Sequence, residues 1–149
     1  MTNRPTASRA SEARARLTTD ANVWVATASA DGLPHMVPLS LAWLDDQIIV
    51  ATPTNTLTVS NILSNGRARA ALDSADDVVI LDADVAVIDF DAAEPALIAR
   101  YVERVGWDPR NIEGAWSLLL MTPRRGQAWN GPSEIHGRII IRNGQWADS

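Results

Sequence analysis

The chain alternates hydrophobic and polar residues in short runs, a pattern typical of β-strands that are buried on one face. The first run covers residues 23–27 and ends near Asp31-Gly32, a dipeptide that tolerates the positive φ of a tight hairpin turn. A second strand is predicted over residues 35–44. The other predicted strands are 47–52, 67–72, 78–89, 116–121, 126–129 and 135–142, with a last short strand at Trp146.

Three stretches have helical spacing instead. Residues 8–18 predict a polar helix that lies on the surface and covers one end of the sheet structure. The turn and cap residues 53–56 predict a short helix that follows them and ends at Asn65-Gly66. Asp91 and Glu94 have the spacing of a capping box, which predicts a third helix with an apolar face formed by Leu97, Ile98, Tyr101, Val102 and Val105.

Pro38 lies inside the second predicted strand. Proline has no N–H to donate to a β-ladder, so it marks an edge or a bulge where the backbone is free to meet another partner.

Short strands at close spacing, interrupted by helices, predict a mainly β, α+β fold, and a closed or split antiparallel barrel is favoured over a sandwich. The 149 residues are long enough for one domain, 1–149, in which residues 1–18 form an N-terminal helical segment.

Composition narrows the range of functions. The formal net charge of -5 repels polyanions, so no nucleic-acid partner is expected. The chain has no cysteine, which excludes disulfides, thiolate zinc sites and a cysteine nucleophile. No apolar run is long enough for a signal peptide or a membrane span, which predicts a cytoplasmic protein without a membrane partner.

Common catalytic motifs are missing from the sequence. It has neither a G-x-S-x-G nucleophile elbow nor a glycine-rich phosphate loop. The two histidines, His35 and His136, are far apart and no HExxH-like spacing occurs, so no metal site is expected.

Two groups of residues carry a family resemblance through their order and spacing. The first is Val25-Ala26-Thr27, Asp31-Gly32, Pro34-His35, Val37-Pro38, Ala51-Thr52-Pro53, Thr56 and Asn61-Ile62; the second is Trp129, His136, Arg138, Gly144 and Trp146. Together they cover nearly the whole chain. The sequence thereby resembles the pyridoxamine 5'-phosphate oxidase-like flavin and deazaflavin oxidoreductases, which have the FMN-binding split barrel.

The resemblance implies a homodimer that holds FMN, or alternatively the deazaflavin F420, in a groove between protomers. The cofactor ring lies along strand residues 37–40 in such relatives, the segment 52–58 faces the phosphate, and Trp129 and Arg138 close the groove from the partner subunit. The cofactor-binding residues implied are Val37, Pro38, Leu39, Ser40, Thr52, Thr56, Thr58, Asn61, Trp129 and Arg138, and His136 and Glu134 are the implied substrate contacts.

Four positions depart from the family pattern. Leu57 and Thr58 stand where phosphate-binding relatives have a basic pair, and Val37 replaces an arginine of the oxidase proper. Each lost charge removes a charge-assisted hydrogen bond of about 1.5–3 kcal/mol. Glu134 lies near the place of a substrate-binding arginine, where a carboxylate repels pyridoxal phosphate. True pyridoxamine phosphate oxidase activity is therefore not expected.

The function predicted from the sequence is a flavin- or deazaflavin-dependent oxidoreductase that transfers hydride to or from a small organic substrate. The cofactor supplies the chemistry, so no catalytic side chain is assigned. If F420 is the cofactor, Arg14 or Arg16 is a hypothetical partner for its polar tail. The alternatives are a non-enzymatic carrier of a flavin, F420 or haem-like ligand, and a barrel that has lost its cofactor and serves as an interaction domain.

Overall fold

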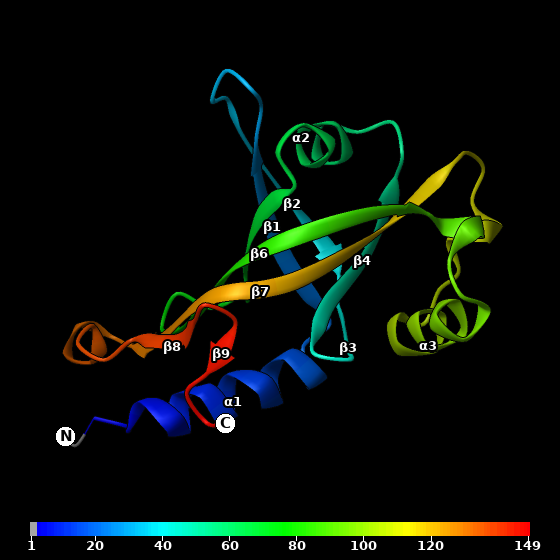
Figure 1. Ribbon diagram of the computed structural model, residues 1–149. Coiled ribbons are helices and arrows are strands. Elements are labelled where there is room, and N and C mark those ends of the chain that lie inside the picture. Colours follow the sequence, from blue (N-terminus) through cyan, green and yellow to red (C-terminus); the bar gives the residue numbers. More distant parts are fainter. Residues whose placement is uncertain (1–2) are drawn as a thin grey trace.

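A computed structural model describes residues 3–149, which form a curled antiparallel sheet with helices at its ends (Figure 1). The sheet order is β2-β1-β5-β6-β7-β4-β3, and β8 joins the outer part of β7 and pairs in turn with β9. The strands are β1 Asn22–Ala28, β2 Pro34–Ser40, β3 Ala42–Leu44, β4 Gln47–Pro53, β5 Arg67–Ala71, β6 Asp77–Asp89, β7 Trp116–Asn130, β8 Ile139–Arg142 and β9 Gln145–Trp146. The mainly β, split-barrel prediction is confirmed.

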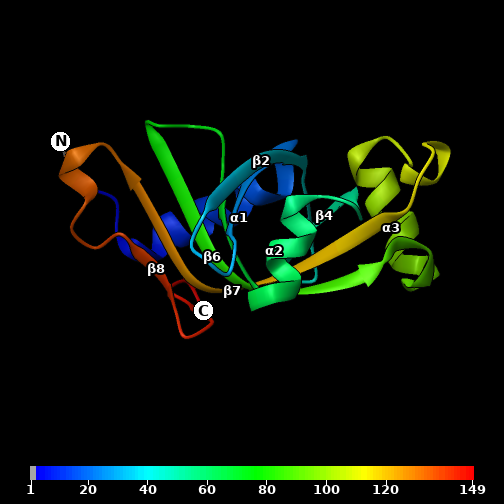
Figure 2. The same ribbon diagram turned by 90° about the horizontal axis from the view of Figure 1, so that it is seen from above.

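In residues 3–149, three α-helices accompany the sheet: α1 Thr6–Thr19, α2 Leu57–Asn65 and α3 Pro95–Val105. Figures 1 and 2 place α1 and α2 on different sides of the curled sheet, whereas α3 lies beyond it at the far end of β6 and β7. Single 3-10 turns occur at Phe90–Ala92, Pro109–Asn111 and Pro132–Glu134. Within the described chain, none of the helices is both long and apolar enough to cross a membrane.

The core formed by the described residues is divided into two clusters. The larger one fills the barrel with alternate residues of the strands, and it includes Ala10, Ala13 and Leu17 of α1, each at most 1% exposed. The predicted polar helix therefore buries one apolar stripe deeply. The smaller cluster lies under α3, where Phe90 and Tyr101 pack edge to face with ring centroids 6.4 Å apart.

β7 is one strand of 15 residues, so the prediction of separate strands at 116–121 and 126–129 is wrong. A bulge explains the error, because Pro123 pairs with Ala83 and Arg125 with Asp82, which leaves Arg124 as the extra residue. The sequence around Pro123 has the composition of a turn, yet the bulge lets the ladder continue through it.

Residues 135–138 do not extend a strand, contrary to the prediction for 135–142. The chain instead makes a 3-10 turn at Pro132–Glu134, and Gly131 and Gly137 have φ values of 68° and 74°. Both glycines adopt left-handed conformations that break strand geometry. Only Ile139–Arg142 pairs as β8.

Two other local predictions also need correction. The strand predicted over 35–44 is interrupted at Leu41, whose N–H donates to the Ala21 carbonyl at 2.9 Å. The capping box of Asp91 and Glu94 is not formed: Asp91 lies in a 3-10 turn, while Glu94 is the N-cap residue of α3 without a side-chain hydrogen bond. Pro95 starts this helix because its fixed φ suits the first helical position.

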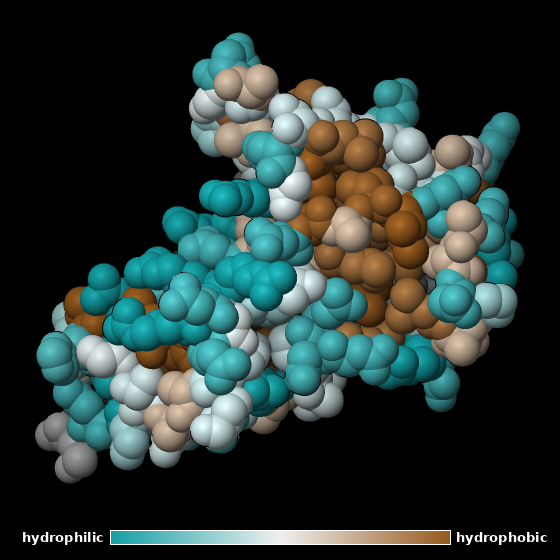
Figure 3. All heavy atoms as spheres, in the orientation of Figure 1, coloured by the Kyte–Doolittle hydropathy of each residue, from teal (hydrophilic) through white to brown (hydrophobic). Residues whose placement is uncertain are grey.

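Apolar side chains also gather on the outside of the molecule. Figure 3 shows a continuous hydrophobic surface over the part of β6 and β7 that lies between α2 and α3. In this part of the two strands Ala86 is exposed, and Ile88 and Leu120, which share its face of the sheet, are only half-buried. Monomeric proteins rarely leave such a patch uncovered.

Candidate functional site

Apart from the β2 residues 37–40, the predicted site residues divide into two groups at the two ends of β7. One end of this strand, at Trp116, pairs with Pro53, next to the segment that leads into α2. The other end carries Trp129 and continues into the loop 131–138. Trp116 and Trp129 are thirteen residues apart in one strand, a separation of up to roughly 40 Å at strand rise. A single protomer therefore does not bring the two groups together.

β2 is an edge strand, as Pro38 predicts. Among the described residues it pairs only with β1, and the register from Pro34 to Ser40 runs without a bulge. The edge interpretation of Pro38 is thus correct and the bulge interpretation is not. The carbonyl of Ser40 accepts a hydrogen bond from the Tyr101 hydroxyl at 3.1 Å, which means that it points away from β1.

Alternation along the strand defines which backbone groups are free. Since the Ser40 backbone points outward, those of Met36 and Pro38 do so too, whereas the N–H of Leu39 turns toward β1. The outward donors are therefore the N–H groups of Met36 and Ser40, while Pro38 offers only its carbonyl. Met36 is 60% exposed beside this edge.

Two aromatic residues fix the end of β2, and the sequence analysis missed both. The Tyr101 hydroxyl, buried under α3, accepts from the Ala51 N–H of β4 at 3.0 Å while it donates to Ser40. Burial raises the pKa of this phenol to about 12, so it stays protonated and keeps donating. The indole N–H of Trp107 donates to the Ser40 hydroxyl at 3.1 Å. The sequence predicts Tyr101 only as part of an apolar face.

We expect Tyr101→Phe to lower the free energy of unfolding by about 1–3 kcal/mol, because it leaves the buried Ala51 N–H without an acceptor. Urea denaturation measures this difference. Phe90→Leu is the matched control, since it alters packing in the same cluster and leaves the hydrogen bond intact. Native-state hydrogen exchange at Ala51 should accelerate in Tyr101→Phe only; equal protection in both variants would contradict the role of the hydroxyl.

The N-terminus of α2 is capped by Thr56. Its hydroxyl accepts from the Val59 N–H at 3.3 Å and donates to the Pro53 carbonyl at 3.1 Å. The next residue, Leu57, is 60% exposed. The N–H groups of Leu57 and Thr58 have no acceptor within the helix, because the first turn of any α-helix leaves such donors free.

The other residues predicted in this region are buried. Thr52, Thr58 and Asn61 are 3%, 1% and 5% exposed. The Asn61 amide donates to the Thr27 hydroxyl at 3.1 Å, a contact that links α2 to β1. These three side chains face the protein interior, so they support the segment but do not project from it.

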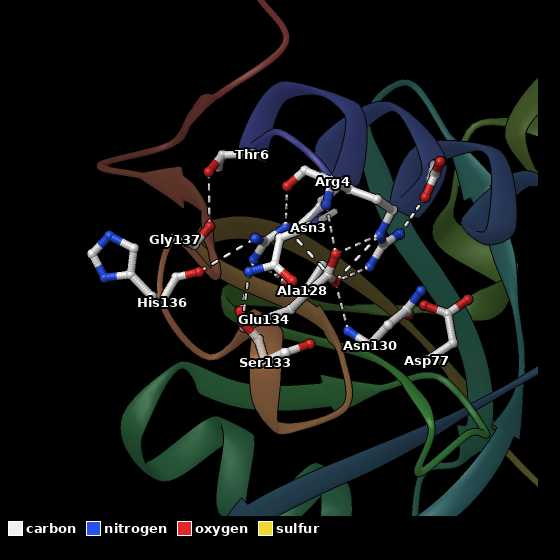
Figure 4. A network of polar contacts seen from close by, with 12 residues as sticks. Asn3, Arg4, Thr6, Asp77, Ala128, Asn130, Ser133, Glu134, His136 and Gly137 are labelled. Carbon is white, nitrogen blue, oxygen red and sulfur yellow. Dashed lines mark hydrogen bonds and ion pairs between the residues drawn. The ribbon is translucent and has the colours of Figure 1, made fainter. Parts of the chain in front are cut away.

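At the other end of β7, Glu134 lies in a network with the N-terminal segment (Figure 4). It is 4% exposed and accepts from the Arg4 guanidinium at 2.7 Å, the Arg4 N–H at 2.9 Å and the Asn130 N–H at 2.7 Å. The hydrogen bond from the Arg4 side chain is the main reason that the pKa of this carboxyl falls to about 2. Both oxygens are occupied by the protein itself, which argues against the expected substrate contact.

This network predicts an acid dependence of stability. A carboxyl whose pKa is lowered on folding stabilises the folded state above its unfolded pKa, near 4.5, and loses that effect as the pH falls toward 2. We expect the unfolding free energy to decline across this window, and Glu134→Gln to make the decline shallower. Urea denaturation at several pH values measures the slope. A wild-type slope unchanged in Glu134→Gln would rule out Glu134 as its source.

Arg9 is the centre of the same network and is 3% exposed. Its guanidinium donates to the carbonyls of Arg4 at 3.0 Å, Glu134 at 2.8 Å and His136 at 3.3 Å. Thr6 adds a hydrogen bond from its hydroxyl to the Gly137 carbonyl at 2.8 Å. The start of α1 therefore holds the loop 131–138 in place, a role that the sequence analysis did not predict for a helix interpreted as polar and superficial.

The remaining residues of this group lie at the surface. The His136 side chain is exposed and points away from the network in Figure 4. Arg138 is half-buried and donates to the Gln127 side chain at 3.0 Å and the Ile135 carbonyl at 2.9 Å. Trp129 is half-buried at the end of β7. His136 and Arg138 do not share a strand face, because the chain turns at Gly137.

The arginines proposed for the F420 tail are already engaged. Arg14 bonds Asp148 and Asp46, each at 3.2 Å, and its guanidinium lies 4.2 Å from the centre of the Trp146 ring. Arg16 donates to the Asp77 carbonyl at 2.6 Å. Both side chains hold α1 to the barrel, which argues against the tail hypothesis. No group of three metal-ligating side chains occurs in residues 3–149.

Comparison with known proteins places the chain in a family. A model of the pyridoxamine 5'-phosphate oxidase family matches residues 10–130, most of the chain. Comparison with curated protein sequences gives no match.

Several solved structures share the fold. A conserved hypothetical protein of Mycobacterium tuberculosis superimposes with a TM-score of 0.65 at 18% identity, covering 83% of this chain and 86% of its own. An F420 reductase gives 0.61 at 16%, with 76% and 94% covered. An FMN binding protein related to pyridoxamine 5'-phosphate oxidase, from Nostoc punctiforme, gives 0.54 at 14%, with 83% and 80% covered. With the match over residues 10–130, the chain belongs to the pyridoxamine 5'-phosphate oxidase family.

Proposed function

We propose that this protein is a homodimeric oxidoreductase that binds FMN or F420 between its protomers and transfers hydride to or from a small organic substrate. The observation that carries the proposal is the free edge of β2, which presents outward backbone groups on a strand that α2 also contacts. Family membership and fold neighbours named as an FMN binding protein and an F420 reductase support it.

The separation of the two residue groups supports the dimer. Because Trp129 and the start of α2 lie at opposite ends of β7, one site that uses both must draw them from two protomers. The apolar surface over β6 and β7 provides a face that association would bury (Figure 3). A two-fold dimer then contains two equivalent sites.

The β2 edge and the start of α2 would bind different parts of the cofactor. The outward N–H groups of Met36 and Ser40 donate to a carbonyl or ring nitrogen of the cofactor, and Tyr101 and Trp107 hold Ser40 in place for this. The free N–H groups at the start of α2 donate to the phosphate, since a helix N-terminus favours an anion. The bound flavin or deazaflavin supplies the hydride chemistry.

The partner protomer closes the site. Trp129 contributes an aromatic surface, and the Arg138 guanidinium adds positive potential while Gln127 and the Ile135 carbonyl fix its orientation. His136 is exposed on the same loop and is the remaining substrate contact that we propose. We do not propose Glu134 as a substrate contact, because its carboxylate already accepts hydrogen bonds from Arg4 and lies 3.8 Å from Arg9.

Carriage of a cofactor without turnover is the second candidate. The exposed Leu57 leaves the phosphate end of the site without the basic pair of phosphate-binding relatives. Weaker binding of the phosphate favours a protein that releases and exchanges its cofactor.

Titration with FMN and with F420 tests the proposal, using cofactor fluorescence and the emission of the six tryptophans. We expect saturable micromolar binding of one cofactor, weakened by Trp129→Ala or Arg138→Ala. Turnover of the reduced cofactor with candidate acceptors then separates the enzyme from the carrier. If neither cofactor binds with a dissociation constant below about 1 mM, a binding free energy of roughly -4 kcal/mol, both the enzyme and the carrier are refuted.

A further inference from the structure

A groove of about 970 Å³ opens on the outer surface of β5, β6 and β7. Its walls are the end of β1, the end of α2 and the turn between β8 and β9. It contains none of the residues assigned above to the cofactor site, so it is a separate feature of the fold. The charged side chains that line it are Arg67, Arg69, Arg124, Arg125, Arg142, Asp82 and Asp84.

Five arginines and two aspartates give the groove an excess of three positive charges, although the chain as a whole has a net charge of -5. The aspartates are already shared. Asp82 pairs with Arg69 at 2.6 Å and lies 3.8 Å from Arg125, while Asp84 pairs with Arg124 at 2.8 Å.

Arg67 and Arg142 set this groove apart from the rest of the surface. In residues 3–149 every other arginine side chain makes a hydrogen bond or an ion pair within the protein. These two make neither, and both line the same groove. Although the chain has more acidic than basic residues, the two guanidinium groups that are unpaired in residues 3–149 both lie in this groove.

The groove walls are held by the backbone. The Gly144 N–H donates to the Arg124 carbonyl at 2.9 Å, which fixes the turn next to Arg142 against β7. On the opposite side, the Arg67 N–H donates to the Asn65 side chain at 3.0 Å, and the Val85 N–H to the Gly66 carbonyl at 2.8 Å. Both unpaired arginines therefore project from anchored backbone.

We propose that this groove binds a small organic anion that carries two or more phosphate or carboxylate groups. A guanidinium matches the planar geometry of both groups through paired N–H donors. The groove has the volume of a small-molecule site. Arg67 and Arg142 make the direct contacts, and Arg69, Arg124 and Arg125 add positive potential while the aspartates hold them. The net negative charge of the chain disfavours a long polyanion such as nucleic acid.

Isothermal titration of the full chain with inorganic pyrophosphate and with citrate, at fixed ionic strength, tests the proposal. We expect saturable binding of at least one, and Arg67→Ala and Arg142→Ala should each weaken it about tenfold. Arg100→Ala is the matched control: it removes the same charge from an exposed arginine that pairs with Asp45 outside the groove, and it should leave the affinity unchanged. A preference for pyrophosphate or citrate distinguishes a phosphorylated ligand from a polycarboxylate.

Asp84→Asn gives a test of opposite sign. It removes a carboxylate from the groove and releases Arg124, so it should tighten binding.

The proposal is overturned if neither anion saturates, if Arg100→Ala weakens binding as much as Arg67→Ala, or if heparin binds and the small anions do not. Sedimentation of the same variants provides the last check: an Arg67 and Arg142 double substitution that shifts the oligomeric state while the anion affinity stays unchanged would make the groove a protein contact and overturn the proposal. None of these outcomes depends on FMN or F420 binding.

Discussion

Replacing Leu57 with lysine is expected to tighten FMN binding at least about tenfold. Leu57 is the first residue of α2 after the Thr56 cap and is 60% exposed, so the change disturbs no core. A lysine there meets the phosphate with a charge-assisted hydrogen bond, worth about 1.5–3 kcal/mol. A positive charge near a helix N-terminus costs about 0.3–1 kcal/mol in the free protein, which is smaller than the gain on binding.

Two further variants locate the effect. Leu57→Glu should abolish detectable FMN binding while it stabilises the helix start, because a carboxylate there repels phosphate and suits the helix dipole. Leu63→Lys is the matched control, since Leu63 is 70% exposed nearer the other end of the same helix. If Leu57→Lys and Leu63→Lys change the affinity equally, the effect is one of net charge and the phosphate does not lie at the start of α2.

Arg9→Ala should lower the free energy of unfolding by about 3 kcal/mol, because removing one member of a buried charged network strands the others. The Arg9 guanidinium donates to four backbone carbonyls and lies 3.8 Å from the Glu134 carboxylate. Urea denaturation measures the loss. Loop 131–138 should also loosen, so the same variant should weaken cofactor binding through Trp129 and Arg138.

Glu12→Ala provides the control for Arg9→Ala. Glu12 pairs with Arg4 from the same helix as Arg9, yet its side chain is 55% exposed, so we expect a loss within about 0.5 kcal/mol. Equal losses in the two variants would mean that the network contributes no more than a surface ion pair.

Local chemistry in the sequence predicted the elements that depend on neighbouring residues. Asp31-Gly32 marked the β1–β2 hairpin, and Gly32 has a φ of 83°. Asn65-Gly66 marked the end of α2, where Gly66 takes the left-handed conformation that its lack of a side chain allows. Pro38 indicated the sheet edge because proline has no N–H to donate to a neighbouring strand.

Features that depend on distant partners could not be predicted in the same way. Arg9 and Glu134 are 125 residues apart, and nothing around either residue indicates that they meet. The hydroxyl of Tyr101 matters only because the ends of β2 and β4 approach each other under α3. The bulge at Arg124 is defined by the register of β6 against β7, so the sequence of β7 alone does not predict it.

The orientation of the predicted site residues also depends on distant partners. The family pattern identified segments, and the segments lie at defined edges and ends of the sheet. It could not tell which side chains within them face outward: Thr58 and Asn61 turn inward, while Leu57 between Thr56 and Thr58 turns outward. The arginine groove did leave a signal, because Arg67 and Arg69, like Asp82 and Asp84, are two residues apart and so share a strand face.

Mixed dimers test the central claim, that each cofactor site is built from two protomers. One variant, Trp129→Ala with Arg138→Ala, lacks the group at the end of β7; the other, Leu57→Glu, lacks the phosphate end. Each should lose binding alone, measured by titration with whichever cofactor the wild-type protein binds. Co-expressed at equal levels, they should recover about a quarter of the wild-type sites, because half of the dimers are mixed and each contains one intact site. No recovery in dimers shown to be mixed would contradict the shared site and place both groups in the same protomer or outside the cofactor site.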